Sequence, residues 1–126
     1  MVTMTTPEHT AAHGRDVQQA LAPLARELRR AIPDVYAGFS QLHDAALAPG
    51  ALDTKTKELI ALAIAVSKEC DGCIAAHAKA AARAGATEAE VAEMLGVTIL
   101  MNGGPATVYA PRALASFQDF ATPPAT

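Results

Sequence analysis

The sequence predicts an all-α fold, and three observations support this prediction. About thirty of the 126 residues are alanine, aromatic residues make up only 4% of the chain, and tryptophan is absent. Alanine has the highest helix propensity, so this composition favours closely packed helices. Apolar residues recur at intervals of three and four, and no segment alternates as a strand does. We therefore expect a helical subunit of about six helices.

Composition divides the chain into three segments. Residues 1–15 and 121–126 are rich in threonine, proline and alanine, and we expect both to be poorly ordered. Residues 16–120 between them are predicted to form a single helical domain. A domain of this size can bury a core without disulfide bonds.

The first two predicted helices span residues 16–31 and 34–47, and Pro33 separates them. Each carries apolar residues at helical spacing on one face. The turn after the second helix contains a proline–glycine pair, which stops a helix. In this second helix His43 is expected to be a structural or surface residue.

The third predicted helix spans residues 54–68, and Asp53 is a good N-cap for it. Its run ELIALAIAV is apolar almost all the way round, so we expect the helix to be buried on most sides. A break is expected at Asp71-Gly72. The fourth helix then continues to Gly85, a residue that suits the left-handed position after a helix.

The last two predicted helices span residues 88–101 and 105–120. Thr87 and Glu90 have the spacing of a capping box for the first of them. This helix is apolar on more than one face, as the third is. A domain of this size has few places to bury two such helices, so we expect a homo-oligomer that covers the surplus apolar surface.

Charge and hydropathy exclude several classes of function. The net charge is −3, with acids and bases interleaved along the chain. No basic footprint for nucleic acid appears, and no amphipathic anchor suggests a membrane. The N-terminal residues lack the pattern of a secretory signal, so we expect a cytoplasmic protein. There, a C-x-x-C pair is more typical of redox chemistry or metal binding than of a structural disulfide.

The candidate site begins with Cys70, Cys73 and His77. On one helix His77 shares a face with Cys73, because it follows four residues later. Cys70 is expected at the N-terminal end of this helix, where free N–H groups favour a thiolate. A thiolate, a nearby base and a second thiol are the parts of a redox cycle.

Glu58 lies twelve residues before Cys70. If the third and fourth helices form an antiparallel hairpin, Glu58 packs on the side of His77. Glu58 lies farther from the turn than His77 does, which suggests a water bridge or a bent helix between them. A carboxylate beside an apolar run has a raised pKa unless it is paired, which suits a proton relay.

Other interpretations of these residues remain open. Taken alone, the two cysteines could be small residues of the core. Together with His77 they could also provide three ligands to a zinc ion. A structural zinc site needs a fourth ligand, and no second C-x-x-C or H-x-x-x-H motif supplies one. An alternative interpretation of Glu58 is a solvent-facing acid next to Lys55 and Lys57. These lysines and Arg112 could either bind an acidic substrate or belong to a solvated surface.

The combined spacing E-x11-C-x2-C-x3-H resembles that of the alkylhydroperoxidase D-like proteins. These proteins belong to the carboxymuconolactone decarboxylase family. The resemblance covers roughly residues 34–118, including KTKELIALAIAVSKECDGCIAAHAKAAARAGATEAEVAEML and the GGPA break. The complete pattern is far more specific than C-x-x-C alone.

The resemblance implies an all-helical subunit that assembles into trimers or hexamers and reduces peroxides without a cofactor. It implies that Cys73 is the peroxidatic thiol, Cys70 the resolving thiol, and His77 with Glu58 the proton relay. The implied reductant is a dithiol, such as a lipoyl protein or thioredoxin, and a peroxiredoxin is a possible partner. The chain departs from the pattern at Gly72, where peroxidase members carry a second histidine.

Two alternative functions are left open. One is the acid–base decarboxylation that gives the wider family its name, which needs no redox pair. The other is a non-enzymatic oligomer that senses redox state through its dithiol. The retained C-x-x-C pair argues against the decarboxylase.

Overall fold

The computed structural model describes residues 13–123 of the chain. This part folds into six α-helices and contains no strand, which confirms the all-α prediction. The expectation of poor order at the two ends concerns mostly residues 1–12 and 124–126, which lie outside the described part. The helices are α1 (Arg15–Ala31), α2 (Pro33–Leu47), α3 (Thr54–Ser67), α4 (Asp71–Arg83), α5 (Glu88–Asn102) and α6 (Gly104–Ala121).

The predicted caps begin the helices as expected. The Asp53 carboxylate accepts a hydrogen bond from the Thr56 N–H at the start of α3. Thr87 and Glu90 form a complete capping box at the start of α5. Each of these caps satisfies backbone N–H groups that the first turn of a helix leaves without a partner. The sequence therefore fixes these boundaries locally.

The predicted break at Asp71-Gly72 is wrong, because both residues already belong to α4. The chain turns earlier, at residues 68–70. There the Glu69 N–H bonds the Val66 carbonyl, and the Cys70 N–H bonds the Ala65 carbonyl at 3.1 Å. This is the bonding pattern of a Schellman motif.

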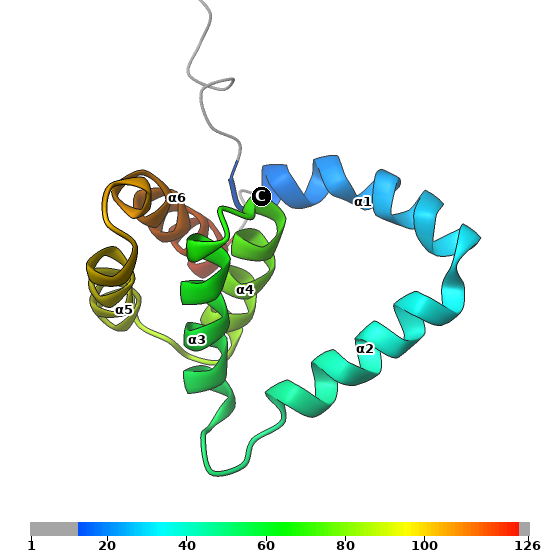
Figure 1. Ribbon diagram of the computed structural model, residues 1–126, viewed down its shortest axis with the longest axis horizontal. Helices are drawn as coiled ribbons and strands as arrows, with labels where there is room; N and C mark the ends of the chain where they lie inside the picture. Colours follow the sequence, from blue (N-terminus) through cyan, green and yellow to red (C-terminus); the bar gives the residue numbers. More distant parts are fainter. Residues whose placement is uncertain (1–12, 124–126) are drawn as a thin grey trace, which may run out of the picture.

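A Schellman motif needs a residue in the left-handed region, and the two turns that flank α4 fill this position differently. Gly85 occupies it after α4, with φ 89°, as predicted. Glu69 occupies it after α3, with φ 54°. A left-handed conformation costs a residue with a side chain about 1–2 kcal/mol. Both turns are short, and Figure 1 shows α3 and α4 side by side as a result.

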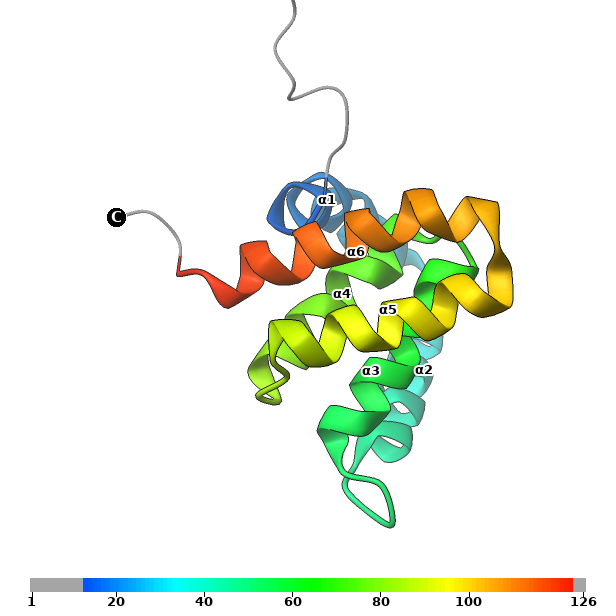
Figure 2. The same cartoon turned by 90° about the vertical axis from the view of Figure 1, so that its left-hand side faces the viewer.

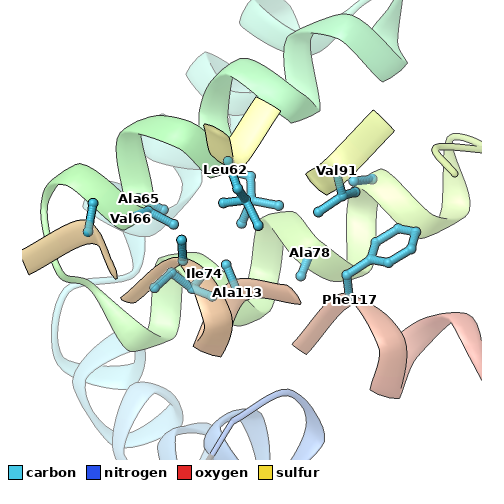
Figure 3. Packing of buried hydrophobic residues seen from close by; sticks show 12 residues of the cluster. Leu62, Ala65, Val66, Ile74, Ala78, Val91, Ala113 and Phe117 are labelled. Carbon is cyan, nitrogen blue, oxygen red and sulfur yellow. The ribbon is translucent and has the colours of Figure 1, made fainter. Parts of the chain in front are cut away.

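The core lies among helices α3 to α6, with α4 packed against both α3 and α6. Figure 2 shows α5 and α6 side by side, in front of α3 and α4. Figure 3 shows how Leu62, Ile74, Val91 and Phe117 fill the centre, with small alanine side chains between them. Alanine at the contact points lets the helix axes approach closely, which explains the alanine-rich composition.

Helices α1 and α2 form an arm that extends away from the other four helices (Figure 1). The start of α1 is tied to α6: the Gly14 N–H donates to the Ser116 hydroxyl, and Arg15 pairs with Asp119 at 3.1 Å. Beyond Val17, however, the arm buries no side chain, and α2 buries none at all. Its apolar residues therefore remain open in the single chain.

The prediction that α3 is buried on most sides is wrong for the single chain. Ile60 and Ile64 are 46% and 53% exposed. They line an apolar hollow of about 400 Å³ together with Val97 and Met101 of α5. The core lies on only one side of α3, and no helix of the described part covers the other side.

No helix of the described residues is long and apolar enough to cross a lipid bilayer.

Candidate active site

The two cysteines lie at the junction between α3 and α4. Cys70 is the N-cap of α4, and it is joined to Cys73 by a disulfide with a Cα–Cα distance of 5.2 Å. The Cys70 sulfur also accepts a hydrogen bond from the Cys73 N–H, at 3.2 Å. Cys73 is exposed, whereas Cys70 is half-buried. The two sulfurs are therefore paired, and the two residues differ in exposure.

The start of α4 favours negative charge on the sulfur of Cys70. The first N–H groups of a helix have no backbone partners, and the helix dipole is positive at this end. A thiolate at an N-cap position is stabilised by both effects. When the disulfide is broken, the Cys70 sulfur is thus well placed to carry the charge.

Glu58 and His77 form the most buried ionisable pair of the site. The Oε1 atom of Glu58 lies 2.7 Å from the Nδ1 atom of His77, and the two residues are 19 positions apart in sequence. Glu58 is only 4% exposed. The expectation that the hairpin brings the two together is confirmed. The contact is direct, without the water bridge or bent helix that the residue count suggested.

Because of this hydrogen bond, the two ring nitrogens of His77 have different roles. Nδ1 faces the carboxylate, so Nε2 is the nitrogen that remains free to accept a proton. The burial of Glu58 also excludes the alternative that it is an ordinary solvent-facing acid. His77 lies one helical turn after Cys73. Its action on the Cys73 thiol remains a prediction.

The cations that sequence analysis left open are held by the fold. Lys55 pairs with Glu90 at 2.9 Å, which joins α3 to α5. Its pKa is raised, mainly by this hydrogen bond, and the pKa of Glu90 is lowered by the same bond. Lys57 donates to the Ala48 carbonyl at the end of α2. These contacts explain both lysines without a substrate.

Arg112 has a position beside the site that the sequence did not predict. It reaches from α6 to Asp71, between the two cysteines in sequence, with a nitrogen–oxygen distance of 3.1 Å. Its Nε atom is buried without a hydrogen-bond partner. The pair holds α6 against the first turn of α4.

Gly72 lies against α1, the first helix of the arm. A Cβ atom added there would lie 2.9 Å from the Cδ1 atom of Leu21 in α1. The absence of a side chain therefore lets α1 approach the turn that carries the cysteines. The same contact shows why a histidine at this position would have to displace Leu21.

His43, which we expected to be a structural or surface residue, is exposed and contacts His77. Its ring stacks on that of His77, with centroids 6.1 Å apart and planes inclined by 23°. His43 comes from α2, whereas His77 comes from α4. A single histidine among helix residues gives no local signal, so only the packing of α2 reveals this contact.

Within residues 13–123, no group of three or more histidine, cysteine, aspartate or glutamate side chains is arranged to hold a metal ion. The zinc interpretation therefore gains no support from the described part of the chain.

The sequence profile of the carboxymuconolactone decarboxylase family matches residues 33–116. The chain belongs to this family. The match covers α2 to α5 and most of α6, and so includes Glu58, both cysteines and His77. The resemblance seen in the sequence is confirmed.

Relatives and solved structures agree with this assignment. A crystal structure of a carboxymuconolactone decarboxylase family protein from Legionella pneumophila, in its apo form, has a TM-score of 0.79 and 42% identity, covering 82% of this chain and 93% of that one. A structure from Thermotoga maritima has a TM-score of 0.66 and 30% identity, covering 75% and 88%. An uncharacterized protein from Cupriavidus necator is 40% identical, covering 81% of this chain and 93% of its own length.

Proposed function

We propose that this member of the carboxymuconolactone decarboxylase family is a thiol-dependent peroxidase, an oxidoreductase that reduces peroxides through Cys70 and Cys73. One observation carries the proposal. A disulfide-forming pair lies at the N-terminus of α4, and the same helix carries a histidine bonded to a buried carboxylate. A decarboxylase would need the acid–base pair but not the dithiol.

In the oxidative half of the cycle Cys73 attacks the peroxide, because it is the more exposed cysteine and lies one turn from His77. His77 accepts the thiol proton at Nε2 while Glu58 stabilises the resulting imidazolium. The thiolate takes the terminal oxygen, the O–O bond breaks, and the leaving oxygen receives a proton to give an alcohol or water. Cys70 then attacks the sulfenic acid, which forms the disulfide and releases water.

In the reductive half a dithiol supplies two electrons. Its thiolate attacks the exposed Cys73 sulfur and expels Cys70, which leaves as a thiolate stabilised at the helix N-terminus. The second thiol of the reductant then releases Cys73 and closes the reductant's own disulfide. A lipoyl protein or thioredoxin has the required chemistry, and a peroxiredoxin disulfide is an alternative substrate for the reduced protein.

The protein is proposed to work as a homo-oligomer, such as a trimer or hexamer. Helix α2 buries no side chain, yet its Val35 and Leu42 are 63% and 64% exposed. The hollow between α3 and α5 is also apolar. Large apolar surfaces on one chain mark contacts with another. Light scattering measures the assembly, and Leu42→Asp is expected to reduce its size.

The proposed reaction is tested with reduced protein and peroxide. Wild-type protein is expected to lose two hydrogens, with the new bond mapped by mass spectrometry to Cys70 and Cys73. Cys73→Ser is expected to lose peroxide turnover, and Cys70→Ser to stop at a sulfenic acid or a mixed disulfide. Wild-type turnover in both variants would disprove the proposal. Decarboxylation of a muconolactone acid that persists in Cys70→Ala/Cys73→Ala would identify the acid–base enzyme instead.

A further inference from the structure

We propose that His43 is a further catalytic residue of this site, the acid that protonates the leaving oxygen of the peroxide. The inference rests on the proposed peroxidase function. It goes beyond that function because it assigns the second proton transfer to α2, which belongs to the arm and not to the helices that carry the cysteines.

His43 is the most exposed of three side chains that contact one another in turn. The Glu58, His77 and His43 side chains are 5%, 21% and 43% exposed, so exposure rises step by step from the interior outward. The rings of the two histidines are stacked at 6.1 Å. Nδ1 of His43 faces the Asp44 carboxylate at 3.4 Å. Its Nε2 is therefore the nitrogen left to meet a substrate.

His43 also faces a space that can hold a substrate. A hollow of about 480 Å³ opens beside α2, and His43 lines it together with Arg29, Tyr36, Phe39 and Ser40. This volume lies within the range of small-molecule pockets. The walls are mainly apolar with one cation, which suits an organic hydroperoxide better than hydrogen peroxide alone.

The charged groups around His43 come from several helices. Asp44 lies on its own helix, Arg29 lies across the hollow on α1, and the Glu58–His77 pair lies behind the ring. Among these groups, His43 is the one that both lines the hollow and has ring nitrogens that can hold or release a proton.

The proton balance needs two positions, and the two histidines supply them. His77 takes the proton of the Cys73 thiol as the sulfur attacks. His43, in its imidazolium form, gives the Nε2 proton to the alkoxide as the O–O bond breaks, which yields the alcohol. The proton on His77 then replaces the one that His43 lost, directly or through water. The net change is transfer of the thiol proton to the alcohol.

The test uses peroxides whose leaving groups differ in their need for a proton. Reduced protein is mixed with tert-butyl hydroperoxide, which releases an alkoxide, or with peracetic acid, which releases a stable carboxylate. His43→Phe keeps a ring on His77 but cannot carry a proton, and His43→Gln is polar without titrating. Gln41→Ala, an exposed neighbour on α2, is the matched control.

With tert-butyl hydroperoxide both His43 variants are expected to lose thiol about 100-fold more slowly, the lower range of general acid catalysis. With peracetic acid they are expected to match wild type, as is Gln41→Ala with both peroxides. Equal slowing on both peroxides, or none on either, would overturn the role of His43 alone. A wild-type protein that consumes neither peroxide would overturn the peroxidase function as well. Circular dichroism checks folding, which is expected to be unchanged because α2 buries no side chain.

Discussion

Replacing Glu58 by glutamine tests whether the buried carboxylate acts on His77. Glutamine keeps the shape of the side chain and removes only its charge. The 2.7 Å contact is charge-assisted when the carboxylate faces an imidazolium. Such bonds contribute about 1.5–3 kcal/mol, against about 0.5–1.5 kcal/mol for neutral ones. The difference, about 1.5 kcal/mol, corresponds to a rate about tenfold lower.

The assay is a single turnover of reduced protein with excess tert-butyl hydroperoxide, followed by the loss of free thiols. Glu58→Gln is expected to react about tenfold more slowly than wild type. Glu93→Gln makes the same chemical change on the exposed surface of α5 and is expected to react at the wild-type rate. If Glu58→Gln were as fast as wild type, His77 would not depend on the carboxylate, and the proposed relay would be wrong.

Three further predictions concern stability. Glu69→Gly should raise the free energy of unfolding by about 0.5–1 kcal/mol, because Glu69 has a positive φ and glycine adopts it without strain. Leu62→Ala should lower it by about 2–5 kcal/mol, because Leu62 is fully buried in the core. Glu90→Gln should lower stability at neutral pH, because the bond to Lys55 lowers the pKa of Glu90. Because the pKa of Glu90 is lower in the folded protein than in the unfolded chain, the ion pair contributes its full stability above the ordinary glutamate pKa. This contribution is lost as the pH falls through the pKa of Glu90 in the folded protein.

Urea denaturation followed by circular dichroism measures all three effects. A Glu69→Gly variant less stable than wild type would show that the turn is not strained by its side chain. A Leu62→Ala variant within 1 kcal/mol of wild type would contradict the position of the core, given the usual cost of about 2–5 kcal/mol. For Glu90→Gln, a deficit equally large at pH 7 and at pH 2–3 would contradict the role of the ion pair, since protonation removes that pair in wild type.

The sequence by itself determined the features that depend on neighbours within a few positions. Asp53 and the Thr87–Glu90 box cap their helices as predicted, and Gly85 ends α4. The pairing of Cys70 with Cys73 was also local, because three residues separate sulfurs that one helical turn brings together. Such features follow from backbone hydrogen bonding and helix periodicity, which act along a short stretch of chain.

Prediction from the local sequence failed where a residue other than glycine adopted the left-handed backbone conformation that glycine favours. The break was predicted at Asp71-Gly72, but Glu69 takes the left-handed position instead. The backbone bonds of the turn and the packing of α3 on α4 outweigh the small local cost. This shift makes Cys70 the N-cap of α4.

Only the tertiary structure decided which distant side chains meet. The spacing suggested that Glu58 faces His77, but the direct bond depends on how α3 packs on α4. His43 and Arg112 reach the site from α2 and α6, and nothing near them in sequence indicates this. Contacts over such separations depend on how whole helices pack, and that packing minimises exposed apolar surface across the entire domain. The sequence therefore determined the pairing of the two cysteines, and the fold decided which groups surround them.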